Sequence, residues 1–528
     1  MSFTIGNVLI SESVDPTCAK ILQDNGIKTD TKIGLSRDQL IAELKNYDGL
    51  VVRSATKVTA EVIEGTDRLK VVGRAGTGVD NIDCNAATRN GVLVINAPGG
   101  NAISAAELTC AMIITLSRHL PQACASLKNG KWDRKLYMGQ ELLNKTLAIV
   151  GLGRIGREVA TRMQAFGMKT VGFDPLVPPE ESIKFGVKSY DLNDLWTMAD
   201  YITVHTPLIP QTKNLINDNV FAKCKKGVRI VNCARGGIID ENALLRALES
   251  GQCGGAGLDV YTEEPPKNTA LIQHPKVICT PHLGASTVEA QNRVAVEIAE
   301  QFVDLLHGKN IMGVVNSASF CQLLSPENKP WADLSTSLGK ISSSLIPSGS
   351  GDIKVTITTQ GMQLNKKVTF LSTAVIVGLL QHRIKLGVNC INAPVLAKEA
   401  GIELQQKHED VCLRRNVDSA LVVNIAAGEN KHEIVGLIAG DKAFLGSLDG
   451  ADFFPHVELS GKLLLCRSDN SSVTFPKLIG LFNPQDIQSI WCSSMVNNRV
   501  WYVFNVNKDD SYQKAISSLV DFCAFITL

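Results

Sequence analysis

An arginine, a glutamate and a histidine can together bind a carboxylate and transfer a proton. In this chain of 528 residues, each of three such residues follows a short apolar run. Arg235 stands in the stretch VNCARGGIID, Glu264 in LDVYTEEPP and His282 in TPHLGA. The apolar runs before them are typical of buried strands, and an open parallel sheet binds its ligands beyond the carboxyl ends of its strands. We therefore expect the three side chains to converge at one crevice.

These residue types suit the oxidation of a 2-hydroxy acid. Arg235 can hold the substrate carboxylate through two N–H donors and polarise the forming carbonyl. His282 can accept the hydroxyl proton as hydride leaves for a cofactor. A carboxylate beside the imidazole would orient it and stabilise its protonated form. Glu264, directly before Pro265, is our candidate for that carboxylate, and Glu263 stays open as the alternative. No metal is expected, because no second His or Cys stands at ligand spacing around His282.

A glycine-rich loop indicates where the hydride acceptor would bind. The stretch LAIVGLGRIG is a strand that runs into G-x-G-x-x-G, and the helical REVATRM follows it. Gly151 permits the tight turn, Gly153 lets the backbone approach a pyrophosphate, and Gly156 lets the helix pack closely on the sheet. Asp174 ends the next expected strand, where a carboxylate binds a ribose diol and repels a 2′-phosphate. The pattern predicts NAD rather than NADP.

Taken singly, each of the three polar residues also has an ordinary structural interpretation. The histidine could be packed in a core, the arginine could stabilise a turn, and the glutamate could be a solvated loop residue. Their occurrence together beside a dinucleotide-binding loop favours the catalytic interpretation.

Two blocks of alternating strand and helix patterns position these loops. The first covers about the first hundred residues, and the second runs from about 146 to 285 with about six strands. Such alternation predicts an α/β fold with two parallel sheets, each covered by helices on both faces. We expect residues 1–98 plus 286–310 to form a substrate-binding domain. Residues 99–285 are expected to form a Rossmann-type domain that binds NAD.

The last part of the chain has a different pattern. Residues 311–450 mix strands and helices and predict an intervening α+β domain. Residues 451–528 read strand, helix, strand, strand, helix, which predicts a small ferredoxin-like βαββα domain.

Composition excludes several classes of partner. The net charge of +1 argues against a general affinity for nucleic acid or for an anionic membrane. The start of the chain lacks a signal-peptide pattern, and no apolar run approaches the ~18–20 residues of a membrane span. The 14 cysteines form no CxxC pair, which favours reduced thiols and a cytosolic, cytoplasmic location.

Five ordered stretches carry a resemblance to a known family. They are VGRAGTGVDNID, GLGRIG, NCARGGIID, GLDVYTEEP and TPHLGAS. Together they resemble the D-isomer-specific 2-hydroxyacid dehydrogenase family, and within it the animal members that oxidise 3-phosphoglycerate. The resemblance implies NAD-dependent oxidation of 3-phosphoglycerate to 3-phosphohydroxypyruvate, the first step of L-serine biosynthesis. It also implies a homo-oligomer, either a dimer or a homotetramer.

The resemblance carries the family's functional residues onto this sequence. The catalytic Arg, Glu and His fall on Arg235, Glu264 and His282. The family's NAD contacts fall on Thr77, Arg154, Ile155, Asp174, Thr206, Cys233, Asp259 and Gly284. The loop positions that we add as NAD contacts are Gly151, Gly153, Gly156, Ala234, Arg235, His282 and Ala285.

A phosphorylated substrate requires cations at its far end. Arg53 and Arg74 each end a strand of the first domain and therefore face the same cleft, and surface ion pairs stay open as the alternative explanation. Backbone N–H groups around Ser54 and Gly76 can bind the carboxylate. The basic, aromatic stretch KWDRKLY resembles the arm through which family members dimerise, so that Arg134 can reach a neighbouring subunit's site.

The tail resembles the regulatory amino-acid-binding (ACT-like) module attached to this family, and the intervening region resembles the extra domain of its longer members. The turn SDNSSVTFP lacks the glycine that lets backbone meet an amino acid in such modules. We therefore expect the tail to support assembly rather than inhibition by serine.

Two other functions stay open. A glyoxylate or hydroxypyruvate reductase needs no phosphate clamp, and its NADPH-using members would not favour Asp174. An NAD-sensing co-repressor, a protein-binding protein, shares the fold and the Arg–Glu–His set. The long regulatory-type extension favours the biosynthetic enzyme.

Overall fold

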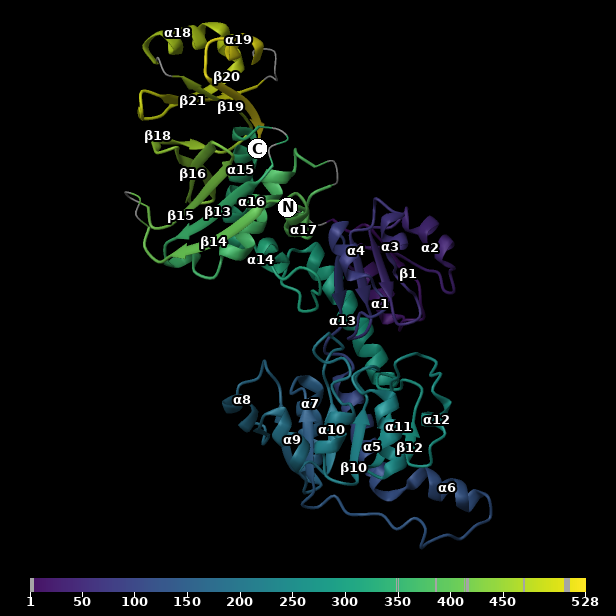
Figure 1. Ribbon diagram of the computed structural model, residues 1–528. Coiled ribbons are helices and arrows are strands. Elements are labelled where there is room, and N and C mark those ends of the chain that lie inside the picture. Colours follow the sequence, from purple (N-terminus) through teal and green to yellow (C-terminus); the bar gives the residue numbers. More distant parts are fainter. Residues whose placement is uncertain are drawn as a thin grey trace.

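Four β-sheets organise the residues that the computed structural model describes, which are 4–347, 349, 351–384, 387–412, 414, 417–468, 471–507 and 513–528 (Figure 1). From the N-terminus they contain five, seven, six and four strands. The first two sheets are parallel α/β units, as the alternating pattern predicted.

The first sheet has the strand order β2-β1-β3-β4-β5. Its strands are β1 (Asn7–Ile10), β2 (Lys28–Thr31), β3 (Gly49–Val52), β4 (Val71–Arg74) and β5 (Leu93–Asn96). Its helices are α1 (Thr17–Asp24), α2 (Arg37–Leu44), α3 (Ala60–Glu64) and α4 (Cys84–Arg89). The sequence analysis missed β2, because its KTDT residues are mostly exposed at the sheet edge and lack an apolar alternation.

The second sheet has the order β12-β11-β10-β9-β6-β7-β8. Its strands are β6 (Thr146–Val150), β7 (Lys169–Phe173), β8 (Lys188–Ser189), β9 (Tyr201–Val204), β10 (Val228–Asn232), β11 (Cys253–Leu258) and β12 (Val277–Cys279). The strand order reverses between β6 and β9, which is where doubly wound sheets bind their ligands. Six of these strands match the expected ones, and the two-residue β8 is too short to give a sequence pattern.

Helices cover both faces of the second sheet. The helices of this region are α5 (Ala102–Arg118), α6 (Leu120–Lys128), α7 (Arg154–Ala165), α8 (Pro179–Ile183), α9 (Leu192–Met198), α10 (Asp218–Lys223), α11 (Glu241–Ser250) and α12 (Thr269–Ile272). Helix α6 contacts α5 and extends away from the sheet (Figure 1). The long helix α5 is largely buried against β10 and β11.

Helix α13 (Val288–Leu306) carries the chain back to the first sheet, as the sequence predicted. Its Phe302 is fully buried. The ring lies where Gly49 of β3 and Gly73 of β4 would place a side chain, so both strands need glycine there. Thr287 caps the helix by accepting a hydrogen bond from the Ala290 amide at 3.1 Å. This packing supports our proposal that the segment around α13 belongs to the first domain.

The third sheet has the order β14-β13-β15-β16-β17-β18 and is covered by helices α15 and α16 (Figure 1). Its strands are β13 (Ile353–Gln360), β14 (Glu403–Glu409), β15 (Ala420–Ala427), β16 (Asn430–Ala439), β17 (Lys442–Leu448) and β18 (Ala451–Glu458). The helices of this region are α14 (Phe320–Leu324), α15 (Lys329–Leu345), α16 (Val368–Leu380) and α17 (Ala393–Glu399).

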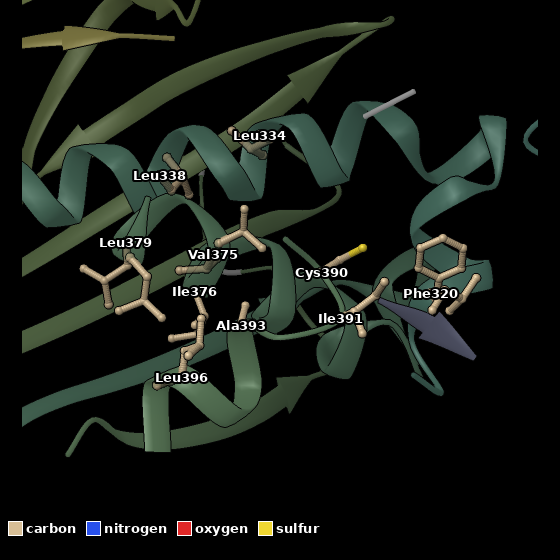
Figure 2. Packing of buried hydrophobic residues seen from close by; sticks show 14 of the residues in the cluster. Phe320, Leu334, Leu338, Val375, Ile376, Leu379, Cys390, Ile391, Ala393 and Leu396 are labelled. Atoms are coloured by element: carbon tan, nitrogen blue, oxygen red, sulfur yellow. The ribbon is translucent and has the colours of Figure 1, made fainter. Parts of the chain in front are cut away.

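The core under these helices is aliphatic. Figure 2 shows Leu334 and Leu338 of α15 beside Val375 and Leu379 of α16. The two helices approach closely because Gly339 faces the backbone of α16 directly, where a Cβ would meet the Val375 carbonyl.

The expected start of the last domain at residue 451 needs correction. Strand β18 begins at Ala451 and pairs antiparallel with β17, so the six-stranded sheet continues to Glu458. We propose that the last domain begins after this strand.

The fourth sheet is ferredoxin-like, with the order β20-β21-β19-β22. Its elements are β19 (Lys462–Ser468), α18 (Ser471–Leu481), β20 (Ile487–Cys492), β21 (Val500–Val506), α19 (Gln513–Ser517) and β22 (Phe522–Thr527). The sequence pattern predicted βαββα, without the final strand β22. This strand was not predicted because a short apolar run cannot be assigned to strand or helix by periodicity alone. Residues 469 and 470, inside the glycine-free turn, lie outside the described residues. In the described part of the chain, no helix is long and apolar enough to cross a membrane.

Candidate active site

A cavity of about 990 Å³ lies between the first and the second sheet. The first sheet contributes Arg53 and Arg74 to its lining, and the second contributes Arg235, Glu264 and His282. The three residues that the sequence expected to converge therefore do line one crevice.

His282 and Glu264 form a direct pair at the mouth of this cavity. The His282 Nδ1 atom lies 2.8 Å from Glu264 Oε2, and the Tyr261 amide donates to Glu264 Oε1 at 3.3 Å. Glu263 forms an ion pair with Lys267 instead. The carboxylate beside the histidine is therefore Glu264, and among the described residues the Nε2 atom of the imidazole has no hydrogen-bond partner.

Asp259 holds the loop that carries His282. Its fully buried carboxylate accepts hydrogen bonds from Thr280 Oγ1 at 2.6 Å, the Leu283 amide at 2.7 Å and the Gly284 amide at 2.8 Å. The Asp259 carbonyl also accepts from the His282 amide at 2.9 Å. His282 has a φ of 55°, a left-handed conformation that such a network can hold in place. Besides the predicted NAD contact, Asp259 thus has a positioning role that the sequence did not reveal.

Arg235 reaches across the cavity to the first sheet. Its Nε donates to Asp80 Oδ2 at 3.0 Å, and its Nη1 donates to the Ala234 carbonyl at 2.6 Å. Asn232 fixes the backbone of the same turn through a 2.8 Å bond to the Arg235 carbonyl. Gly78 makes room for the guanidinium, because a Cβ there would overlap it.

Asp80 was not among the site residues predicted from the sequence. The stretch VGRAGTGVDNID contains it, but only the folded chain shows that its carboxylate faces an arginine 155 residues further on.

The two arginines expected to bind phosphate differ in their surroundings. Arg74 donates to the Arg53 carbonyl at 3.3 Å and to the Gly78 carbonyl, so it joins two loops of the cavity wall. Burial, followed by the charge of Arg235, lowers the pKa of Arg74 to about 10. Arg53 donates to the Ser13 carbonyl at 3.1 Å in an exposed hydrogen bond, although both arginines are half-buried.

The other expected substrate residues fall into two groups. Ser54 and Gly76 line the cavity beside the arginines. Arg134 is exposed in the segment between α6 and β6 and does not line the cavity. Arg134 is therefore not placed at the cavity of its own chain.

The glycine-rich loop joins β6 to α7 and has the geometry of a phosphate cradle. Gly151 has a φ of +98°, and a Cβ there would lie 2.6 Å from the His205 carbonyl oxygen. Gly156 faces the Gly151 carbonyl, whereas the space beside Gly153 is open. Helix α7 begins at Arg154, so its free N–H groups point toward this opening. The residues present therefore fit a pyrophosphate group.

Asp174 stands at the end of β7 beside this loop. Its carboxylate accepts hydrogen bonds from the Leu152 amide at 2.8 Å and the Leu176 amide at 2.9 Å. These bonds hold a negative charge next to the cradle, where a ribose would lie if NAD binds as in doubly wound folds.

The remaining expected NAD contacts surround the same end of the sheet. The Thr206 hydroxyl is buried without a hydrogen-bond partner among the described residues, as is the Nδ1 atom of the neighbouring His205. Buried polar atoms without a protein partner usually bind a ligand or an ordered water molecule. Burial lowers the pKa of His205 to about 4, so its ring is neutral, and the sequence analysis missed this residue.

The other residues predicted to contact NAD differ in their burial and in their hydrogen bonds. Thr77 donates to Asn101 Oδ1 at 2.6 Å at the cavity wall, which Ala285 also lines. Burial raises the pKa of Cys233 to about 12, which favours the protonated thiol. Ile155 lies in the first turn of α7, and Gly284 lies in the loop that Asp259 holds. In the part of the chain that the structure describes, no group of three His, Cys, Asp or Glu side chains is placed to hold a metal ion.

Comparisons with known proteins agree with this geometry. The family model "D-isomer specific 2-hydroxyacid dehydrogenase, NAD binding domain" matches residues 110–284. The chain is 51% identical over 526 residues to D-3-phosphoglycerate dehydrogenase of Rattus norvegicus, covering 98% of both chains. It belongs to the D-isomer specific 2-hydroxyacid dehydrogenase family.

Further matches place the chain within the D-isomer specific 2-hydroxyacid dehydrogenases. It is 52% identical to the D-3-phosphoglycerate dehydrogenase of Homo sapiens, covering 95% of each chain. The "D-3-phosphoglycerate dehydrogenase intervening domain" model matches residues 327–444. A crystal structure of a glyoxylate reductase from Paecilomyes thermophila matches with a TM-score of 0.55 and 27% identity, covering 59% of this chain and 99% of that one. The NAD-binding fold predicted from the glycine-rich loop is thereby confirmed.

Proposed function

We propose that this chain oxidises 3-phosphoglycerate to 3-phosphohydroxypyruvate with NAD, the first step of L-serine biosynthesis. The observation that carries the proposal is the convergence of Arg235, Glu264 and His282 on a cleft that also contains Arg53 and Arg74. Relatives named D-3-phosphoglycerate dehydrogenase match the chain from end to end, which supports this substrate over glyoxylate.

In the proposed reaction, Arg235 binds the substrate carboxylate and draws electron density from the carbon that becomes the carbonyl. His282 accepts the hydroxyl proton on Nε2, since Nδ1 faces Glu264. Glu264 stabilises the resulting imidazolium and keeps the ring oriented. NAD supplies the hydride acceptor when it is bound.

The cradle of Gly151, Gly153 and Gly156 and the carboxylate of Asp174 support the assignment of the cofactor. Backbone N–H groups at the start of α7 bind the pyrophosphate in this proposal. Asp174 accepts hydrogen bonds from the adenosine ribose and repels a 2′-phosphate. Thr206, next to the loop at Gly151, has a buried hydroxyl without a hydrogen-bond partner among the described residues, which supports a polar contact to the cofactor.

We also propose that the chain assembles as a homo-oligomer through the segment 131–138. Its side chains Trp132, Leu136 and Met138 are 75%, 70% and 79% exposed, which is costly for an apolar segment of a monomer. Such an arm would bring Arg134 toward a neighbouring subunit. Light scattering of the wild type and of the Trp132→Ala variant tests this, because the variant should lose the oligomer.

The cytosol is the proposed location, and it is supported by the 14 cysteines, all of which are free thiols in the structure. The small-molecule substrate and the balanced charge support a protein that acts without nucleic acid.

The experiment that tests the function compares substrates in both directions. Initial rates are measured with 3-phosphoglycerate or D-glycerate and NAD, and with 3-phosphohydroxypyruvate, hydroxypyruvate or glyoxylate and NADH. We expect kcat/KM for each phosphorylated substrate to exceed that of its unphosphorylated analogue by at least 100-fold. A preference for glyoxylate would support the reductase alternative, and NAD binding without turnover of any of these would support the co-repressor alternative.

A further inference from the structure

Two cysteines of the fourth sheet lie directly opposite each other. Cys466 of β19 and Cys523 of β22 are register partners in an antiparallel pair, between Leu465↔Ala524 and Arg467↔Phe522. The Cα atoms of directly opposed residues in antiparallel strands are roughly 4.5–5.5 Å apart. Disulfides bridge Cα separations of about 4.4–6.8 Å, so the backbone is already spaced for a bond.

Both side chains point to the same face of the sheet. Cys466 belongs to the core under α18, with Leu478 and Phe504, and Cys523 packs against the same core. The register places the two thiols beside each other on this face. Formation of a disulfide there would require side-chain rotation but no change of strand register.

The two thiols differ in their surroundings. Cys466 is fully buried, and its pKa is raised by the neighbouring Cys523 thiol and by burial. Cys523 is partly exposed on the edge strand, and its pKa is lowered by the neighbouring Cys466 thiol and by Ser517, against the opposing effect of burial. By contrast, burial raises the pKa of Cys18 to about 12. A thiol with a lowered pKa and access to solvent is the kind that oxidants attack first.

We propose that Cys466 and Cys523 are a reversible oxidation site that closes to a disulfide in the presence of hydrogen peroxide. The Cys523 thiolate attacks one peroxide oxygen, the O–O bond breaks, and hydroxide leaves, so that Cys523 becomes a sulfenic acid. The Cys466 thiol then attacks the Cys523 sulfur, and the S–O bond breaks with loss of water. In total, two thiols and one H₂O₂ give one disulfide and two H₂O.

The location gives the bond a structural effect. Among the described residues, strand β22 is the edge strand of its sheet and pairs there with β19. It also touches the intervening domain, because Lys340 Nζ of α15 donates to the Thr527 carbonyl at 3.0 Å. A disulfide would fasten β22 to the centre of the sheet and thereby fix one contact between the last two domains.

The test uses the full-length enzyme with NAD bound. The protein is treated with hydrogen peroxide, its remaining thiols are blocked with N-ethylmaleimide, and its peptides are analysed by mass spectrometry. We expect a linked pair of peptides containing Cys466 and Cys523, 2 Da lighter than their sum, that dithiothreitol separates. Labelling of Cys523 by N-ethylmaleimide should fall at least tenfold on oxidation and recover on reduction.

Variants separate the two chemical roles. In Cys466→Ser, Cys523 should stop at the sulfenic acid and react with dimedone. In Cys492→Ser the linked peptides should form as in the wild type, because this exposed cysteine of β20 is the register partner of Tyr502 rather than of a thiol. Oxidation of Cys523 to sulfinic acid in the wild type without linked peptides would overturn the proposal. Unchanged labelling of Cys523 after peroxide would overturn it as well.

Discussion

Arg235 and Asp80 come from different sheets and meet across the cleft, with Arg235 Nε 3.0 Å from Asp80 Oδ2. A second bond, from Arg235 Nη1 to the Ala234 carbonyl, holds the other side of the guanidinium. Among the described residues, the Nη2 group donates no hydrogen bond. Asp80 therefore orients the arginine in a way that leaves donors for a substrate carboxylate, and it does so only when the two sheets face each other as here.

The role of Asp80 can be measured with Asp80→Asn. The charge-assisted bond to Arg235 weakens, so we expect kcat/KM for 3-phosphoglycerate to fall about 10- to 100-fold, which equals roughly 1.4–2.8 kcal/mol. The dissociation constant of NAD, from fluorescence titration, should stay within twofold. The matched control is Asp83→Asn, because Asp83 lines the same cavity but caps α4 through the Ala86 amide, and Asn caps equally well. Equal losses in both variants would count against an orienting role.

The pairing of Glu264 with His282 predicts a large effect of Glu264→Gln. The neutral amide cannot stabilise the imidazolium, so kcat should fall by roughly 10²–10⁴-fold while KM changes little. Glu263→Gln is the control, since Glu263 pairs with Lys267 and should keep wild-type kcat within about twofold. A similar kcat for both variants in steady-state assays would show that Glu264 is not the partner that matters.

Arg53 is the sharper test of the phosphate clamp. Arg74 supports two backbone carbonyls, so Arg74→Ala should also lower thermal stability, whereas Arg53→Ala should leave the melting temperature close to the wild type. Loss of a charge-assisted contact is worth about 1.5–3 kcal/mol. We therefore expect kcat/KM for 3-phosphoglycerate to fall at least tenfold in Arg53→Ala, with little change for D-glycerate. An equal loss for both substrates would refute the clamp.

Asp174 should set the preference for NAD over NADP. Asp174→Asn keeps an acceptor for the Leu152 amide but removes the charge that repels a 2′-phosphate. The ratio of kcat/KM with NAD to that with NADP should drop at least tenfold, with KM for 3-phosphoglycerate unchanged. If the ratio stays the same in parallel assays, a group other than Asp174 discriminates between the ribose of NAD and the 2′-phosphate of NADP.

Most of the fold and most of the active-site residues could be predicted from local sequence patterns. The glycine-rich loop, the strand ends before Arg235 and His282, and the amphipathic helix after Thr287 each have a mechanism that acts within a few residues. The strands that were missed lack such a signal. Strand β2 is polar, β8 has two residues, and β22 is a short apolar run at a sheet edge.

The residues missed at the site depend on tertiary contacts instead. Asp80 belongs to the site because the fold brings its carboxylate to Arg235. His205 belongs to it because its ring is buried next to Thr206. The loop-holding role of Asp259 likewise appears only when its carboxylate is seen to accept three bonds from residues 280–284. Periodicity and motif spacing contain no information about such pairings.

The central claim is that this cleft oxidises 3-phosphoglycerate with His282 as the base. The most direct test is the rate of NADH formation from 3-phosphoglycerate and NAD, followed at 340 nm, in the wild type and in His282→Asn. We predict steady turnover by the wild type and a loss of at least 10²-fold in kcat for the variant, with NAD still bound. A wild type that forms no NADH, or a variant that keeps wild-type kcat, would contradict the account.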